Sequence, residues 1–288
     1  AMFANIWVKK GAKRTYFIRH RFKSTNIMRT FASMNQSEGI TVVINTYNAA
    51  RHLATVLEAV KGFDEVLVCD MESTDNTLEI AKAYGCRVVI FPKGAHRIVE
   101  PARQFAIDQA RCPWVLVVDA DEIVPAALRN YLYKAIEAEA DFAAIAIPRK
   151  NYFMGKMMHS CYPDYILRFL KREKCNWPPV IHASPEVEGR IIRIPSARRD
   201  LAFEHLANDG VADIIRKNNT YSDYEVPRRR KKNYGKMALF YRPLYRFVKS
   251  YLLKRGFLDG CPGLIHAVLD AGYQFEIVAK LMEERQKK

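Results

Sequence analysis

Apolar residues in the first two thirds of the chain come in short runs that alternate with stretches of helical spacing. Residues 40–45 form a β-branched run that ends at a polar cluster, and Leu53, Val56, Leu57 and Val60 then recur at helical spacing. The same pattern predicts further strands at 66–69, 87–91, 114–118, 142–147 and 166–171, and helices at 77–84, 101–111 and 125–139. This alternation predicts an α/β fold whose mixed, mainly parallel sheet is flanked by helices.

The pattern changes near residue 207, where strands give way to helical spacing. We therefore expect a catalytic α/β domain at 39–206 and a basic, mostly helical region at 207–288. Residues 1–33 carry eight Lys or Arg and no acid, without the apolar core of a secretory signal. We interpret 1–38 as a basic N-terminal extension that need not be native and exclude it from the predicted fold.

Composition indicates a folded protein, because 49% of the 288 residues are hydrophobic and 27% are charged. No apolar run approaches the roughly 18 to 20 residues that span a bilayer, so a membrane-spanning helix is not expected. The six cysteines are scattered and form no Cys-x-x-Cys pair, which argues against a zinc cluster or a redox motif. We interpret them as reduced and the protein as cytoplasmic.

Positive charge is concentrated between residues 226 and 258. This segment has eleven Lys or Arg and no acid, and six Tyr or Phe lie between the first and the last of these basic residues, at 228 and 255. Such a surface attracts polyanions, which include nucleic acid, anionic lipid head groups and phosphorylated glycolipid, and a solvated helix face is the alternative. We predict peripheral attachment of this segment to an anionic membrane.

Polar residues gather where the predicted parallel strands end. Residues 46–48, then Asp70, then Asp119 and Asp121 follow three of these strands. In open parallel sheets ligands bind outside the carboxyl ends of the strands, so these side chains are expected at one edge. Carboxylates two residues apart suit a divalent cation such as Mg²⁺ or Mn²⁺. The alternative is an acidic loop that caps the next helix, with Glu122 favoured by the helix dipole.

Three motifs in chain order resemble the nucleotide-sugar-binding domain of family 2 glycosyltransferases of the GT-A type. They are 44–48 (INTYN), Asp70 with 73–77 (STDNT), and 119–122 (DADE). Within that family the chain is similar to lipopolysaccharide core β-1,4-glucosyltransferases through 99–104 (VEPARQ), 162–164 (YPD), 167–172 (LRFLKR) and 256–263 (GFLDGCPG). The resemblance runs from about residue 39 to about residue 281.

The resemblance implies roles for individual residues. It assigns the nucleoside of the donor to Thr46, Tyr47, Asp70 and Asp75, and a metal on the donor diphosphate to Asp119 and Asp121. Helix or turn capping is the alternative for Asp70 and Asp75.

Two further residues are expected near the diphosphate. Arg103 on the following helix can neutralise phosphate, although it can also be a surface arginine. The family's matching histidine implies that His205 lies near the diphosphate or the metal, although a histidine packed at a strand end is the alternative.

Inverting transfer requires a carboxylate that removes the proton of the acceptor hydroxyl. The candidates outside the acidic motif are Asp164, Glu186 and Glu188, and Asp164 belongs to the family's Tyr-Pro-Asp pattern. One departure bears on this choice, because the family usually has His-Glu where this chain has His182-Ala183. We therefore take Asp164 as the predicted base and Glu186 as its substitute.

These features predict a metal-dependent hexosyltransferase that moves glucose from UDP-glucose to a lipid-linked glycan such as lipopolysaccharide core. We expect it to act as a peripheral protein on the inner face of the plasma membrane. The alternatives are a transferase of the same fold acting on another cell-surface polysaccharide or on protein, a nucleotidyltransferase, and a nucleic-acid-binding protein. A nucleotidyltransferase would have a Gly-rich triphosphate-binding loop after its first strand, and residues 45–50 of this chain do not form one. Nucleic-acid binding would leave the acidic residues at the strand ends unexplained, so no nucleic acid partner is expected.

Overall fold

The structure is a computed structural model that describes residues 39–94, 96, 99–138, 141–179, 184–206 and 210–287. All of these residues belong to one compact unit, which spans residues 35–288. The predicted extension at 1–38 and the His182-Ala183 departure lie outside the described residues.

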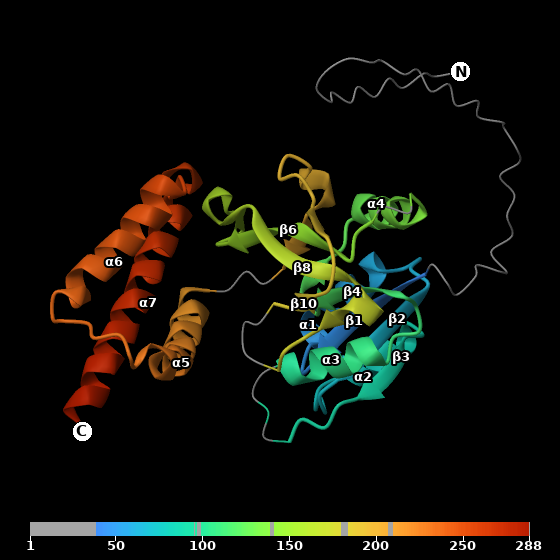
Figure 1. The fold of residues 1–288 in the computed structure, drawn as a ribbon, viewed down its shortest axis with the longest axis horizontal. Helices are drawn as coiled ribbons and strands as arrows, with labels where there is room; N and C mark the ends of the chain where they lie inside the picture. The colour runs from blue at the N-terminus through green and yellow to red at the C-terminus, as the bar shows by residue number, and fades with distance from the viewer. Residues whose placement is uncertain are drawn as a thin grey trace, which may run out of the picture. The chain divides into compact units, whose positions relative to one another are not determined.

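A mixed sheet forms the centre of the fold (Figure 1). Its main path runs in the order β3-β2-β1-β4-β8-β6-β12-β5, while β7 and β11 pair with β6, and β9 and β10 form a separate pair. The strands are β1 (Ile40–Thr46), β2 (Glu65–Asp70), β3 (Arg87–Ile90), β4 (Trp114–Asp119), β5 (Glu122–Ile123), β6 (Ala144–Phe153), β7 (Lys156–Met157), β8 (Asp164–Lys171), β9 (Cys175–Asn176), β10 (Glu186–Val187), β11 (Ile191–Arg193) and β12 (Phe203–His205).

Strands β1 to β4 are parallel, and β8 pairs antiparallel with both β4 and β6. This confirms the mixed, mainly parallel sheet flanked by helices that the sequence predicts. The strands of two or three residues, including β5 and β12, were not predicted, because so few residues show no alternation of apolar and polar positions.

Helices cover both faces of the sheet, which is why the central strands read as continuous apolar runs. The described α-helices before residue 207 are α1 (Ala50–Ala59), α2 (Thr77–Ala83), α3 (Glu100–Asp108) and α4 (Ala126–Glu137). Ile44 of β1 packs with Leu53 and Leu128 on the face that α1 and α4 cover, and Val43 packs with Ala106 of α3 on the other. This packing fixes the strand ends that carry the polar motifs.

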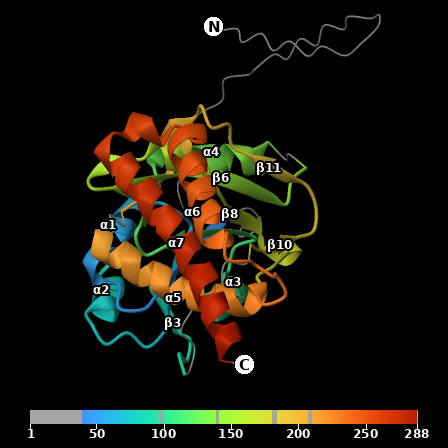
Figure 2. The ribbon, with the colours of Figure 1, turned by 90° about the vertical axis from the view of Figure 1, so that its left-hand side faces the viewer.

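The remaining described chain is helical. It consists of α5 (Val211–Arg229), α6 (Ala238–Val248), a π-helical turn η4 (Lys249–Leu253), a 3₁₀ turn η5 (Gly256–Asp259) and α7 (Cys261–Gln286). Figure 2 shows α7 running along α6 and across α5, and Val226 packs with Ile277 and Leu281 between α5 and α7. None of the described helices has the length and apolar content to cross a bilayer.

A buried aspartate joins these helices to the sheet. The carboxylate of Asp259 accepts hydrogen bonds from the backbone amides of His159 (2.7 Å) and Ser160 (2.9 Å) and from Ser160 Oγ (2.6 Å). Burial raises the pKa of Asp259, but these hydrogen bonds outweigh that effect and hold the pKa below its usual value. The family-like segment at 256–263 therefore has an anchoring function in this structure.

Candidate active site

The polar motifs meet at the carboxyl ends of β1, β2 and β4. Thr46 lies beside Asp70 in the pairing of β1 with β2, and Asn45 lies beside Asp119 in the pairing of β1 with β4. The structure therefore brings together at one sheet edge the motifs that the sequence separates by more than 70 residues, as expected for parallel strands.

Asp70 is fully buried at this edge. Its carboxylate accepts hydrogen bonds from Thr46 Oγ1 (2.8 Å), Ser73 Oγ (2.6 Å) and the Ser73 amide (2.8 Å). These bonds fix the position of the first and second motifs relative to each other.

Asp75 links the starts of two helices. Its carboxylate accepts a hydrogen bond from the Ala50 amide (3.1 Å) at the start of α1 and from the Thr77 amide (3.0 Å) at the start of α2. The hydrogen bond from the Thr77 hydroxyl, with those of the amides, lowers the pKa of Asp75. This is the capping arrangement that the sequence left open as the alternative, and a role of Asp75 in donor binding stays a prediction.

Tyr47 is exposed at the mouth of this region. The ammonium of Lys93 lies 4.5 Å from the centre of its ring, within the range of a cation–π interaction. An exposed aromatic ring beside a strand end is suited to stacking on a planar base.

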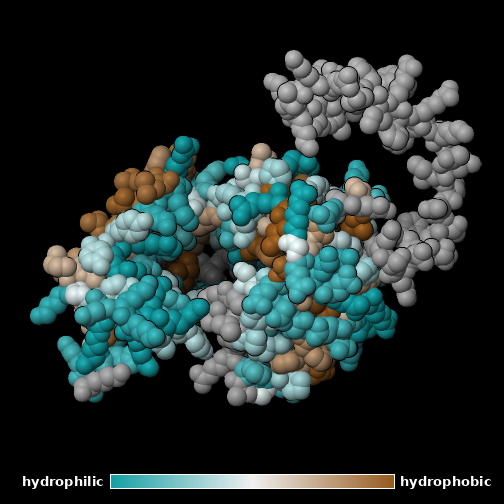
Figure 3. All heavy atoms as spheres, in the orientation of Figure 1, coloured by the Kyte–Doolittle hydropathy of each residue, from teal (hydrophilic) through white to brown (hydrophobic). Residues whose placement is uncertain are grey.

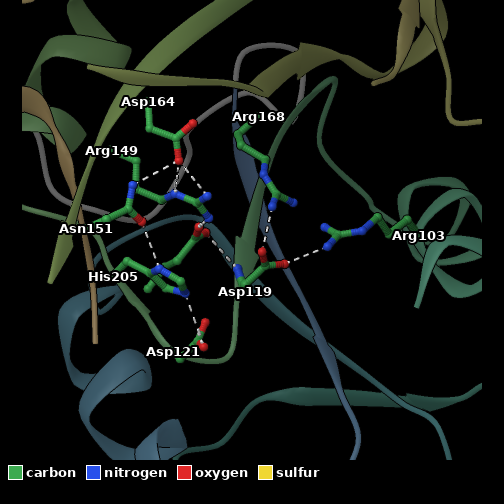
Figure 4. Close-up of polar contacts among 9 residues, drawn as sticks. Arg103, Asp119, Asp121, Arg149, Asn151, Asp164, Arg168 and His205 are labelled. Carbon is green, nitrogen blue, oxygen red and sulfur yellow. Dashed lines mark hydrogen bonds and ion pairs between the residues drawn. The ribbon is translucent and has the colours of Figure 1, made fainter. Parts of the chain in front are cut away.

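Two arginines bind one carboxylate at the end of β4 (Figure 4). Arg103 Nη2 lies 2.8 Å from Asp119 Oδ1, and Arg168 Nη2 lies 2.6 Å from Asp119 Oδ2. Burial raises the pKa of Asp119, but the charges of both arginines outweigh burial and hold the pKa well below its usual range. The carboxylate therefore stays ionised, and both of its oxygens are used by the arginines.

The two arginines carry more positive charge than Asp119 compensates. Each is only 7% exposed, and each lies near the ring of Trp177. Within the described chain, the Nη1 atoms of both arginines are buried without a hydrogen-bond partner. Buried donors of this kind are usually satisfied, so this corner of the site is suited to an anion.

Asp121 faces His205 across the cleft (Figure 4). The Nε2 atom of His205 lies 3.4 Å from Asp121 Oδ2, and its Nδ1 atom lies 3.0 Å from Asn151 Oδ1. The amide of Asn151 donates from Nδ2 to Asp164 Oδ2 (3.0 Å), which only accepts, so the oxygen of Asn151 faces the histidine. His205 therefore donates a hydrogen bond from Nδ1 to Asn151, and its other ring nitrogen, Nε2, faces Asp121.

This pair fits a divalent cation. A lone pair on Nε2 and a carboxylate oxygen that face each other need a shared positive charge, which a proton or a metal ion supplies. Among the described residues, no three His, Cys, Asp or Glu side chains form a cluster that would hold a metal by themselves. A cation at Asp121 and His205 would thus need further oxygen ligands from a bound molecule, as Mg²⁺ does when it binds phosphates.

Asp164 belongs to a second charged network next to this pair. Arg149, directly opposite it on β6, donates to Asp164 Oδ2 (2.7 Å) and to the fully buried Glu122 Oε1 (2.8 Å). Burial raises the pKa of Asp164, but attraction to Arg149 and hydrogen bonds from Asn151 and Arg149 lower it below its usual value. All of these bonds reach Oδ2, so Asp164 is an ionised carboxylate whose Oδ1 atom accepts none of them.

Two cavities meet at His205. The larger, of about 910 Å³, is lined by the strand-end residues Thr46, Tyr47, Arg103, Asp119 and Asp121, and by Asp213, Lys217 and Tyr221 of α5. The smaller, of about 390 Å³, is lined by Asp164, Asn151 and residues of α6, η4 and α7. His205 lines both, so the space beside Asp121 adjoins the space beside Asp164.

Glu186 lies apart from these cavities. It is an exposed residue of β10, and Asn176 Nδ2 donates to it at 3.3 Å. Neither cavity is lined by Glu186 among its described residues. Its part in catalysis therefore stays a prediction that the geometry does not support.

Beyond Arg103, sequence reasoning missed the cationic side of the site. Arg149 and Arg168 pair with its carboxylates, the ring of Trp177 lies near the guanidinium of Arg168, and three residues of α5 line the larger cavity. The sequence could have indicated Arg168, because this arginine interrupts an otherwise apolar strand. The α5 residues had none, since their position depends on how the helices pack against the sheet.

The sequence of the chain is similar to a known protein family and to individual glycosyltransferases. Residues 41–185, about half of the chain, match the model described as Glycosyl transferase family 2. The lipopolysaccharide core biosynthesis glycosyltransferase LpsC of Rhizobium meliloti is 26% identical over 249 residues, which cover 82% of this chain and 89% of that protein.

One further relative and one solved structure extend over most of the chain. An uncharacterized glycosyltransferase of Rickettsia typhi is 24% identical over 85% of this chain and 87% of its own length. The solved structure of the mannosyltransferase PcManGT from Pyrobaculum calidifontis, in complex with GDP-Man and Mn²⁺, is 16% identical with a TM-score of 0.47 and covers 87% of this chain and 76% of that chain.

Proposed function

Since the chain belongs to glycosyl transferase family 2, we propose that it transfers glucose from UDP-glucose, with inversion, to a lipid-linked glycan such as lipopolysaccharide core. The relative named for lipopolysaccharide core biosynthesis supports this choice of acceptor. Family membership favours this function over the nucleotidyltransferase and the nucleic-acid-binding protein. A lipid-linked acceptor would place the enzyme at the cytoplasmic face of the plasma membrane, as a peripheral protein.

The observation that carries the proposal is the set of groups that share the larger cavity. Thr46, Tyr47, Arg103, Asp121 and His205 all line it. In the proposed complex the nucleoside binds beside Thr46 and Tyr47, with Asp70 fixing Thr46 through its hydroxyl, and the diphosphate binds beside the arginine and the Asp121–His205 pair. A cavity of this volume falls within the roughly 300 to 1,000 Å³ of small-molecule sites.

Asp121 and His205 are the residues that would hold Mg²⁺ or Mn²⁺, with oxygens of the diphosphate as further ligands. A divalent cation supplies Lewis-acid stabilisation of the charge that develops on the leaving diphosphate. The Asn151 amide fixes the His205 ring in the orientation that directs Nε2 toward Asp121. Asp119 orients the two arginines, and its direct binding to the metal stays a prediction.

Asp164 is the proposed general base, and the smaller cavity is the proposed acceptor site. Arg149 and Asn151 fix the carboxylate through Oδ2, so Oδ1 can accept the proton of the acceptor hydroxyl. The Arg149 contact also keeps Asp164 ionised at neutral pH, which is the protonation state that a base requires. Because His205 lines both cavities, this carboxylate would lie next to the proposed donor site.

A thermal-shift screen of nucleotide sugars with and without Mn²⁺ tests the proposal. A ligand that binds only the folded state raises the unfolding temperature. We expect the largest rise with UDP-glucose plus Mn²⁺ and little rise with the sugar nucleotide in the presence of EDTA. An equal rise with GDP-mannose would contradict the uridine donor, and no rise with any nucleotide sugar would contradict the function.

A further inference from the structure

An apolar stripe on α6 and η4 is exposed and has no partner among the described residues. From 237, just before α6, to 245 its large side chains recur three and four residues apart, and those at 252 and 253 follow seven and eight residues after 245. This spacing places them on one side of the helix. We name these seven residues the α6 face: Met237, Phe240, Tyr241, Leu244, Tyr245, Leu252 and Leu253. Phe240 is 69% exposed, Leu244 64% and Leu253 71%, and Figure 3 shows hydrophobic side chains gathered over this part of the molecule.

The other side of the same helical segment lines the smaller cavity. Arg246, Ser250 and Lys254, four residues apart, lie on its wall together with Asp164. Whatever binds the α6 face is therefore separated from the proposed acceptor site by a single helix. A molecule bound to the α6 face would therefore lie close to the proposed acceptor site.

A basic pocket of about 310 Å³ adjoins the α6 face. Tyr241 and Tyr245 belong to both, and the other lining residues are Arg229, Arg242, Arg246, Lys249 and Gln274. Arg229 pairs with Glu225 and Arg246 with Asp270. In the part of the chain that the structure describes, Arg242 and Lys249 pair with no carboxylate, and Arg242 Nε is buried without a hydrogen-bond partner. The pocket therefore has positive charge available for an anion.

Residues 228–232 form the longest run of basic residues in the sequence, but their charge is less available for binding an anion. Arg228 and Arg229 pair with Glu225 at 3.3 and 2.7 Å, and Arg230 pairs with Glu284 at 2.6 Å. These contacts offset part of the charge that the sequence alone suggests.

We propose that the α6 face inserts into an anionic bilayer and that the basic pocket binds a head-group phosphate. Helices with an apolar stripe, flanking cations and interfacial Tyr residues lie in the membrane interface in this way. The proposal deepens the proposed function, because it names the membrane contact that would bring a lipid-linked acceptor to the smaller cavity. A second copy of the chain fits less well, since two like-charged basic pockets would face each other across the interface.

Vesicle co-sedimentation of the full chain, without donor, tests this contact. We expect binding to phosphatidylglycerol vesicles that falls with salt, and weak binding to phosphatidylcholine vesicles. The triple variant Phe240→Ser, Leu244→Ser, Leu253→Ser should bind anionic vesicles at least about tenfold more weakly. These side chains are exposed, so the thermal unfolding midpoint should stay unchanged.

A charge-matched pair of variants tests the pocket. Arg242→Gln with Lys249→Gln should weaken vesicle binding about tenfold, whereas Lys231→Gln with Lys232→Gln removes the same charge outside the pocket and should weaken it at most about threefold. Inorganic phosphate should compete with vesicles only at concentrations that also screen charge, because a free phosphate lacks the apolar contact.

Three results would overturn the proposal. Vesicle binding by the triple variant equal to that of the wild type excludes insertion of the α6 face. Equal losses in the two charge variants exclude a specific pocket. If the wild type forms a dimer and does not bind vesicles, and the triple variant is a monomer, the α6 face contacts a second copy of the chain instead of a membrane. Donor binding measured without vesicles is independent of all three, so failure of the membrane contact is distinguishable from failure of the proposed function.

Discussion

The strand-end site and the α6 face use charge in opposite ways. At the strand ends Asp70 is held by several donors, Asp119 by Arg103 and Arg168, and Asp164 by Arg149. Along α6 and η4 the cations outnumber the acids, and large apolar side chains are exposed between them.

The charges at the strand ends orient reacting groups, whereas the charges near the α6 face attract a binding surface. Buried, paired charges keep a fixed geometry and a fixed protonation state, which catalysis requires. Unpaired cations beside apolar side chains attract an anionic surface without fixing a reaction geometry. Substitutions at the strand ends should therefore change the reaction, whereas substitutions on the α6 face should change only membrane binding.

The largest effect is expected from Asp121→Asn. The amide removes the negative charge opposite His205, and we expect metal-dependent hydrolysis of UDP-glucose to fall by at least about a thousandfold, since Lewis-acid stabilisation accounts for several kcal/mol. Steady-state assays across a Mn²⁺ titration measure the loss.

Asp200→Asn is the matched control for this change. Asp200 is an exposed partner of Arg198 and does not line the larger cavity among its described residues, so its activity should equal that of the wild type. Wild-type metal dependence in Asp121→Asn would contradict the assignment.

Asp164→Asn should lower transfer to acceptor by about a hundredfold to a thousandfold while donor binding is retained, as expected for loss of a general base. The ionised form is the active one, so activity is lost as pH falls through the pKa of Asp164. Because Arg149 lowers this pKa, the acidic limb of the wild-type pH–rate profile should lie below the usual range of an aspartate. An acidic limb at or above that range would argue against Asp164.

Arg149→Met should destabilise the fold by about 3–5 kcal/mol, because it leaves the fully buried Glu122 without its ionic partner. The double variant with Glu122→Gln removes the uncompensated charge and should recover part of the loss. Urea unfolding of the two single variants and the double variant measures the coupling. Additive losses would show that the two side chains do not stabilise each other.

Glu186→Gln should change transfer by less than about twofold. Its carboxylate is exposed on β10, and one hydrogen bond to Asn176 is a weak constraint. A loss as large as that of Asp164→Asn would transfer the role of base to Glu186.

The sequence predicted the six described strands of four or more residues, the order of motifs and their convergence at one sheet edge, because buried parallel strands leave a strong local pattern and their ends meet by topology. It did not predict that both oxygens of Asp119 bind arginines, since Arg168 reaches the site from β8, which joins the sheet antiparallel 49 residues later. It located the basic segment but not the α6 face. Which cations near α6 are paired depends on Glu225, Asp270 and Glu284, two of which belong to α7.

Calorimetric titration of UDP-glucose into the wild type and Asp121→Asn, each with Mn²⁺ and with EDTA, tests the central claim most directly. The account predicts that Mn²⁺ strengthens binding to the wild type by at least about tenfold, about 1.4 kcal/mol, and leaves the variant's affinity unchanged. Equal affinity in Mn²⁺ and EDTA for the wild type, or the same metal effect in the variant, would contradict a metal-dependent donor site at Asp121 and His205.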